Sequence, residues 1–263
     1  MKLVIQPDAK HAEGLVASLI AKALREKPSL VLGLATGRTM EPVYKDLVRM
    51  HREEGLDFSL CRTFNLDEYI GLPPDHPGSY RYYMDHHLFN HINIDKRNTF
   101  LPDGMAEDIP ASCLCYEERM EACGGVDLQL LGIGADGHIG FNEPLSALGS
   151  RTRDISLDPS TLAVNSKLFK NPEEMPKRAI TMGVGTILDA GETLLLVTGA
   201  AKAGILAKAV EGPVTSMISA SALQFHPHCR VIVDEEAAAK LEGQAYYRWM
   251  FENEPEWAEY RGK

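Results

Sequence analysis

Along the chain, short apolar blocks alternate with longer blocks in which apolar residues recur at helical spacing. The apolar blocks lie at 2–5, 29–35, 61–66, 127–134, 179–184, 193–199 and 230–234. The helical blocks lie at 8–26, 41–54, 79–90, 110–122, 201–211 and 235–241. Because most strand blocks are apolar at nearly every position, we expect strands that are covered on both faces. This order predicts an α/β fold with a doubly wound, mostly parallel sheet flanked by helices.

The chain of 263 residues shows neither an internal repeat nor a linker, so we expect a single domain over 1–263. One stretch, 145–178, is long, polar and irregular. Connections of this length in a compact domain tend to be lids or binding loops, and we expect a lid segment there. The aromatic tail 246–263 suits either a C-terminal helix or a subunit contact, and the sequence does not choose between them.

Composition narrows the range of functions. The formal net charge is −10 without a long basic run, which argues against nucleic-acid binding. No apolar stretch is long enough to span a bilayer, and the N-terminal MKLVIQPDAK turns polar too soon for a signal peptide. The five cysteines are scattered, and Cys113 and Cys115, two positions apart, do not share a helix face. We expect a cytoplasmic protein without a disulfide framework or a metal site.

In sheets of this kind, ligands bind at the carboxyl ends of the strands. The loop LATGRTMEP follows the strand at 29–35 and opens a helix. Its residues Thr36, Gly37, Arg38 and Thr39 would offer N–H groups and hydroxyls to an anion at a helix N-terminus. The alternative is a plain strand-to-helix turn with a threonine cap. The loop matches neither the P-loop nor the dinucleotide fingerprint.

Two further loops carry charge at strand ends. Lys202 lies in the first helical turn of VTGAAKAG, where the helix dipole disfavours a cation, so either an anion binds nearby or the lysine is simply solvated. Asp67 and Glu68 end the strand of FNLDEY. Neighbours on an extended segment point to opposite sides, so we expect only one of them to face a cleft. The alternative for this pair is a cap or a solvent contact.

The histidines outside the glycine-rich motif give weaker signals. His87 and His91 have the i, i+4 spacing of half a zinc site, but no acid lies between them and no further ligands are apparent. A surface or interface pair is therefore favoured. His226 and His228 flank a proline in an expected turn and gain no role from their spacing.

The stretch GIGADGHIGFNEP, 132–144, places two acids and a histidine among several glycines at the end of a strand. Its glycines permit positive φ and close approach to a ligand. Asp136 and His138 would lie on this turn, and Pro144 favours an extended Glu143 before an expected helix. A carboxylate on one imidazole nitrogen would leave the other nitrogen for proton transfer. The alternative is a turn with a hydrogen-bonded histidine, and the composition favours catalysis.

Taken together, these motifs resemble the glucosamine-6-phosphate deaminase family. LGIGADGHIGFNEP carries most of the resemblance, with LGLATG, TFNLDEY and SRTR in support, and it extends over nearly the whole chain. The resemblance implies a Rossmann-like fold of the sugar-phosphate isomerase and deaminase type. It also implies the conversion of glucosamine 6-phosphate and water to fructose 6-phosphate and ammonia, in N-acetylglucosamine catabolism, without a metal or an organic cofactor. Family members form hexamers or smaller assemblies, so we expect a homo-oligomer.

The resemblance also implies a role for each site residue. Asp67 would take the C2 proton and deliver it to C1. His138 would open the sugar ring by protonating the ring oxygen, and Asp136 and Glu143 would set its orientation and charge. The phosphate would be held by the loop 36–39 together with Lys167 and Lys202.

Three positions depart from the family pattern. Arg38 stands where many members have Gly or Ser, and Lys167 replaces the usual Arg, a point charge in place of a bidentate clamp. Ile155 stands where members activated by N-acetylglucosamine 6-phosphate carry Lys. Ser146 and Arg153 then form at most a remnant of that effector site, and we predict weak or absent activation.

Two other classes of function stay open. A hydrolase of a phosphosugar lactone would share the fold and the phosphate loop, but it needs no carboxylate for abstraction of a carbon proton. A sugar-phosphate sensor would need neither this acidic cluster nor His138, and it usually carries a basic helix-turn-helix that we do not expect here.

Overall fold

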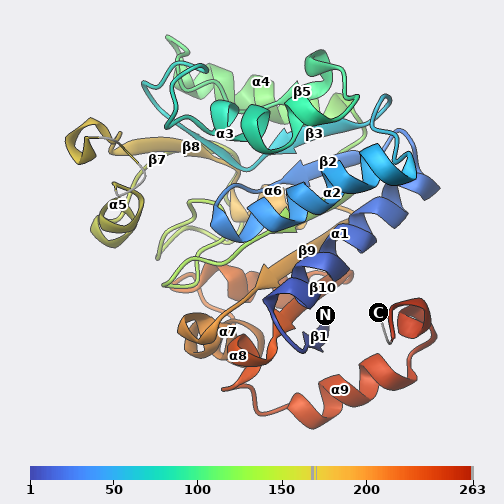
Figure 1. The fold of residues 1–263 in the computed structure, drawn as a ribbon. Coiled ribbons are helices and arrows are strands. Elements are labelled where there is room, and N and C mark those ends of the chain that lie inside the picture. The colour runs from blue at the N-terminus through green and yellow to red at the C-terminus, as the bar shows by residue number, and fades with distance from the viewer. Residues whose placement is uncertain (167–168, 170, 262–263) are drawn as a thin grey trace.

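The computed structural model describes residues 1–166, 169 and 171–261 and has a seven-stranded sheet at its centre (Figure 1). In spatial order the strands are β1 (Lys2–Gln6), β10 (Cys229–Asp234), β9 (Glu192–Val197), β6 (Leu128–Leu131), β2 (Val31–Leu34), β3 (Arg62–Asn65) and β5 (Thr99–Phe100). Every pair in this sheet is parallel. The prediction of a doubly wound, mostly parallel α/β fold is confirmed.

Helices cover the sheet, and most of them begin and end close to the predicted boundaries. They are α1 (Ala9–Glu26), α2 (Glu41–Glu54), α3 (Tyr80–His87), α4 (Ile109–Ala122), α6 (Val184–Leu188), α7 (Ala203–Val210), α8 (Glu235–Ala238) and α9 (Gln244–Asn253). In Figure 1, α1 and α2 cross in front of the strands. None of the helices in the described part of the chain has the length and apolar character needed to cross a membrane.

The core lies between the helices and the strands, which explains why the strand sequences do not alternate. Leu130 and Leu195 are fully buried on neighbouring strands, and so are Leu131, Leu194 and Leu196 beside them. Because both faces of the sheet are covered, inward and outward positions must both be apolar. Trp257 near the C-terminus is also buried in this core, whereas Trp249 on α9 is exposed.

The strand order reverses direction between β2 and β6, which are neighbours in the sheet although about 95 residues apart in sequence. From β2 the chain adds β3 and β5 on one side, and it then returns to place β6 on the other side. Crevices at such a reversal are the usual ligand sites of open α/β sheets. The loops that follow β9, β6, β2 and β3 therefore share one edge.

A second, antiparallel sheet stands beside the first and was not expected. It contains β4 (Asp67–Tyr69), β8 (Arg178–Thr181) and β7 (Arg153–Ser156), in the order β4-β8-β7. The prediction that 179–184 forms a strand of the parallel sheet is thus wrong, because the strand there pairs with β4. The small sheet has its own apolar cluster around Tyr69 and Phe141.

Two predictions for the region after the glycine-rich motif need correction. Residues 144–150 form turns, so the helix expected after Pro144 is absent. The stretch 145–178 is less irregular than expected, since it contains β7 and α5 (Pro159–Asn165). Figure 1 shows α5 set apart from the parallel sheet, at the end of β7 and β8.

Candidate active site

A cavity of about 510 Å³ opens at the carboxyl ends of the central strands. Its walls include the predicted anion loop 36–39 after β2, Asp67 at the start of β4, Asp136 and His138 after β6, and Lys202 after β9. Glu143 does not line this cavity and contacts His138 from behind. The tertiary structure thus gathers residues from four loops at one place.

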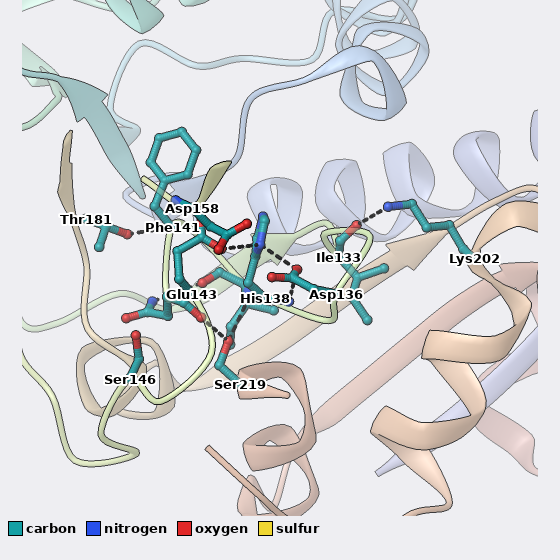
Figure 2. Close-up of polar contacts among 12 residues, drawn as sticks. Ile133, Asp136, His138, Phe141, Glu143, Ser146, Asp158, Thr181, Lys202 and Ser219 are labelled. Atoms are coloured by element: carbon teal, nitrogen blue, oxygen red, sulfur yellow. Dashed lines mark hydrogen bonds and ion pairs between the residues drawn. The ribbon is translucent and has the colours of Figure 1, made fainter. Parts of the chain in front are cut away.

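The imidazole of His138 is held by two carboxylates on the same nitrogen. Nδ1 lies 2.7 Å from Oδ1 of Asp136 and 3.2 Å from Oε2 of Glu143 (Figure 2). Neither contact is aligned as a straight N–H···O bond, so the attraction is mainly that of ion pairs. With Nδ1 engaged in this way, Nε2 is the nitrogen that remains for a ligand.

The two carboxylates change the proton affinity of the ring. Burial alone lowers the pKa of His138, but Asp136 and Glu143 outweigh it, and the net pKa lies above the usual range of a histidine. Burial raises the pKa of Asp136, yet its contacts with His138 bring the net value well below the ordinary one. His138 and Asp136 therefore favour the charged state of both side chains, an imidazolium beside a carboxylate. The side chains are 15% and 26% exposed, so solvent screens them only in part.

Two glycines of the motif allow the close approaches that this arrangement needs. A Cβ at Gly134 would lie 2.4 Å from the Cε1 and Nε2 atoms of His138, so the ring packs directly on the backbone. Gly140 has a φ of 56°, and a Cβ there would lie 2.8 Å from Oγ1 of Thr181 and 3.6 Å from Oδ2 of Asp67. The loop that carries His138 thus passes beside Asp67.

Asp67 and Glu68 lie on β4 and differ in their surroundings, as the sequence predicted. The Glu68 carboxylate accepts N–H groups of Tyr69, Tyr80 and Arg81, two of them at the start of α3. Asp67 faces the cavity and is 6% exposed. Burial and the nearby charge of Glu68 raise the pKa of Asp67 to about 8, although His138 opposes the shift. Burial likewise raises the pKa of Glu68 to about 7 despite its three N–H donors.

The anion loop after β2 begins α2 through a short 3₁₀ turn, Arg38–Met40. Thr36 and Thr39 are partly buried, whereas Arg38 is exposed at the rim of the cavity. The hydroxyl of Tyr83, on α3, donates to the carbonyl of Gly37 at 2.8 Å. This bond ties the loop to a helix that also anchors Glu68.

Lys202 also lines the cavity, from the turn that follows β9. Its Nζ donates to the carbonyl of Ile133 at 2.9 Å, at the end of β6 (Figure 2). Burial lowers the pKa of Lys202, and the charge of Asp136 partly offsets this effect. One carbonyl leaves the ammonium with further donors. Lys167, the other predicted phosphate ligand, lies outside the described residues.

Among the described residues, one group of side chains has metal-ligating atoms close together: Asp136, His138 and Glu143, within 4.8 Å of one another. Their spacing suits direct ion pairing better than a metal. Zn²⁺ with bonds of about 2.1 Å would hold tetrahedral ligand atoms about 3.4 Å apart. Asp136 approaches Nδ1 of His138 more closely than that.

Ser146 and Arg153, the predicted remnant of an effector site, do lie together. Arg153 donates to Oγ of Ser146 at 3.0 Å and to Oδ1 of Asn142 at 2.9 Å. Both line a second cavity of about 460 Å³, which also includes Ile155 and Glu143. Burial lowers the pKa of the Arg153 guanidinium.

Several cavity residues escaped sequence analysis. Tyr80 and Phe141 line the cavity, as do Thr161, Val164 and Asn165 of α5. The hydroxyl of Tyr69 accepts bonds from Asn165 at 3.1 Å and from Tyr80 at 3.2 Å, which connects α5 to β4. No spacing rule reveals these residues, because three separate elements bring them together.

Comparison with known proteins agrees with this geometry. The chain belongs to the family described as glucosamine-6-phosphate isomerases/6-phosphogluconolactonase, whose model matches residues 8–233. Within that family, its close relatives are glucosamine-6-phosphate deaminases. One from Arthrobacter sp. (strain FB24) is 50% identical over 257 residues, 98% of this chain and 99% of the relative. Another from Thermoanaerobacter pseudethanolicus is 46% identical over 241 residues, 92% and 95% of the two chains.

Solved structures support the same placement. A monomeric glucosamine-6-phosphate deaminase matches with a TM-score of 0.89 at 42% identity, over 91% of this chain and 100% of the other. The 6-phosphogluconolactonase from Trypanosoma cruzi matches with a TM-score of 0.73 at 20% identity, over 92% and 97%. The second likeness shows the shared fold alone. The resemblance to the deaminases is confirmed.

Proposed function

We propose that this enzyme converts glucosamine 6-phosphate and water to fructose 6-phosphate and ammonia. The observation that carries the proposal is the meeting of Asp67 with the His138 cluster in one cavity, beside a loop and a lysine suited to phosphate. Each of the three parts of this site matches one requirement of the reaction: ring opening, proton transfer between carbons, and binding of the phosphate.

Ring opening comes first in the proposed mechanism. The C2 hydrogen becomes acidic only when C1 is an open aldehyde, so the hemiacetal must be broken before isomerisation. His138 supplies the proton to the ring oxygen from Nε2, since Asp136 and Glu143 occupy Nδ1 and keep the imidazolium stable.

Asp67 then moves the proton between carbons. As a carboxylate it takes the proton from C2, while the C1 oxygen gains a proton from the substrate ammonium, which gives an enolamine. Return of the first proton to C1 leaves C2 as an iminium, which water hydrolyses to the ketone with release of ammonia. Burial and Glu68 raise the pKa of Asp67 to about 8, which strengthens the carboxylate as a base once it is ionised. The substrate ammonium next to C2 favours that ionised form.

The phosphate is assigned to loop 36–39 and Lys202, which both line the cavity. Backbone N–H groups at the start of α2 and the Lys202 ammonium supply positive charge locally in a chain whose net charge is −10. Lys167 is proposed to add a further contact.

The predicted lid, cytoplasmic location, homo-oligomer and single domain remain proposals. The lid is supported by α5, which contributes Thr161, Val164 and Asn165 to the wall of the cavity. Weak or absent activation by N-acetylglucosamine 6-phosphate is also proposed, because apolar Ile155 lines the cavity beside Ser146 and Arg153. A saturable, several-fold fall in KM on adding that compound would contradict this point.

The test is a coupled assay that measures ammonia and fructose 6-phosphate from glucosamine 6-phosphate without added metal. Mannosamine 6-phosphate serves as the control for the configuration at C2, and 6-phosphogluconolactone tests the alternative of a lactone hydrolase. We expect equal amounts of both products from glucosamine 6-phosphate. Turnover of the lactone alone would overturn the proposal.

A further inference from the structure

The loop between His138 and Glu143 is closed by a side chain from a distant part of the chain. Ser219 begins the 3₁₀ helix η7 (Ser219–Phe225). Its Oγ accepts the N–H of Ile139 at 3.1 Å and donates to the carbonyl of Asn142 at 2.8 Å (Figure 2). Ile139 follows His138 and Asn142 precedes Glu143, so one hydroxyl joins both ends of the intervening loop.

The same segment also holds the other side of His138. The N–H of Ala220 donates to the carbonyl of Gly137 at 2.9 Å. Ser219 is 1% exposed, so water does not readily replace its hydroxyl. Within the loop, the N–H and the Nδ2 of Asn142 also donate to the carbonyl of Ile139, at 3.1 and 2.9 Å, so Ser219 acts together with these bonds on the reach of Glu143 toward His138.

We propose that Ser219 is a positioning residue that sets the distance between Glu143 and Nδ1 of His138. The effect on turnover rests on the proposed function. The effect on His138 itself does not, because the contacts lie within the chain and involve no substrate.

Removal of the hydroxyl has a defined consequence for proton binding. The charged groups around His138 are Asp136 and Glu143 on its own loop and Asp67 on β4, and the charge of Asp136 also acts on Lys202. If the loop widens, Glu143 withdraws and Asp136 alone supports the imidazolium. The pKa of His138 then falls because one of the two stabilising carboxylates is lost.

The chain offers a closely matched control two residues away. Ser221 is also fully buried in η7, and its Oγ accepts the N–H of Thr215 at 2.9 Å and donates to the carbonyl of the same residue at 3.0 Å. It has no hydrogen bond to the loop of His138 among the described residues. Ser219→Ala and Ser221→Ala therefore remove equivalent hydroxyls at different places.

The experiment follows the imidazole signals by NMR against pH in the wild-type protein and both variants, with His138 assigned from the spectrum of His138→Gln. We expect the midpoint of the His138 titration to fall by about one pH unit in Ser219→Ala and to stay constant in Ser221→Ala. In Ser219→Ala, kcat should fall about 10-fold with little change in KM. Equal midpoints in the two folded variants would overturn the proposal.

A second pair of variants covers the case in which Ser219→Ala does not fold. Ser219→Thr keeps the hydroxyl, and Ser219→Val introduces a side chain with the shape of threonine but without the hydroxyl. Only the valine variant should therefore lower the midpoint of the His138 titration. Identical titrations of this pair would also overturn the proposal. If the midpoints differ as expected but the wild type releases no ammonia, the proposed function fails while the positioning role stands.

Discussion

The two titratable groups of the cavity, His138 and Asp67, have opposite electrostatic surroundings. His138 lies between two carboxylates that compensate its charge, at the end of a strand of the parallel sheet. Asp67 lies on the small antiparallel sheet, is almost fully buried, and has another carboxylate, Glu68, as its sequence neighbour. The surroundings of His138 stabilise a charged group, and those of Asp67 destabilise one.

The pKa of His138 and the pKa of Asp67 are both raised, but the two shifts favour opposite charge states. For His138 a raised pKa stabilises the cation, whereas for Asp67 a raised pKa stabilises the neutral acid. Near neutral pH the site therefore favours a proton on each of the two groups. In the proposed mechanism, His138 thus carries the proton for the ring oxygen, and Asp67 becomes a base when a cation such as the substrate ammonium approaches. His138 with its two carboxylates and Asp67 with Glu68 can therefore be altered one at a time.

Replacement of Asp67 should have the largest effect. Asp67→Asn removes the group assigned to both carbon proton transfers, so ammonia release should fall at least about 10³-fold. The measurement is kcat in the coupled assay, with the exposed Asp75→Asn as the control that keeps full activity. An Asp67→Asn enzyme within tenfold of wild type would refute the assignment.

Replacement of His138 should be somewhat milder. His138→Gln slows ring opening, and we expect kcat to fall by about 10²–10³-fold. Because ring opening then limits the rate, the kinetic isotope effect with substrate deuterated at C2 should decrease toward one. A larger isotope effect than in the wild type would show that His138 acts on the carbon proton instead.

The dependence of kcat/KM on pH should separate the ionisation of Asp67 from that of His138. In the free enzyme, kcat/KM should rise as Asp67 ionises near pH 8 and fall at higher pH as His138 loses its proton, since that pKa is also raised. Glu143→Gln removes a charge that stabilises the imidazolium, so the falling limb should move to lower pH by about one unit. The rising limb should stay, and a profile that moves as a whole would contradict this separation.

The smallest expected effect is on stability. The pKa of Asp67 in the folded protein lies above its ordinary value, so the folded state binds more protons between about pH 4 and 8 and loses stability as pH rises through that window. Asp67→Asn removes this loss, and its Tm should exceed that of wild type by about 2–6 °C at pH 8. At pH 5 the difference should shrink. A constant difference at both values would count against the raised pKa.

Much of this arrangement could be predicted from residues that are close in sequence. The apolar blocks identify six of the seven parallel strands, because a strand covered on both faces is apolar at most positions. The glycines of the motif indicate the tight turn on which Asp136 and His138 lie, and the pattern around Glu143 suggests its return to the ring. These features depend on local backbone geometry, which a short stretch of sequence largely determines.

The sequence by itself determined six strands of the parallel sheet, and it identified the acids and the histidine as candidate site residues. Only the tertiary structure decided which of them meet. Asp67 joins His138 because β4 pairs with β8, a strand that the apolar pattern had assigned to the wrong sheet. Ser219 closes the His138 loop from about eighty residues away, which no spacing rule reveals. Long-range pairing and burial arise from the whole fold. Burial favours the neutral form of Asp67, whereas the contacts with Asp136 and Glu143 outweigh burial and favour the charged form of His138.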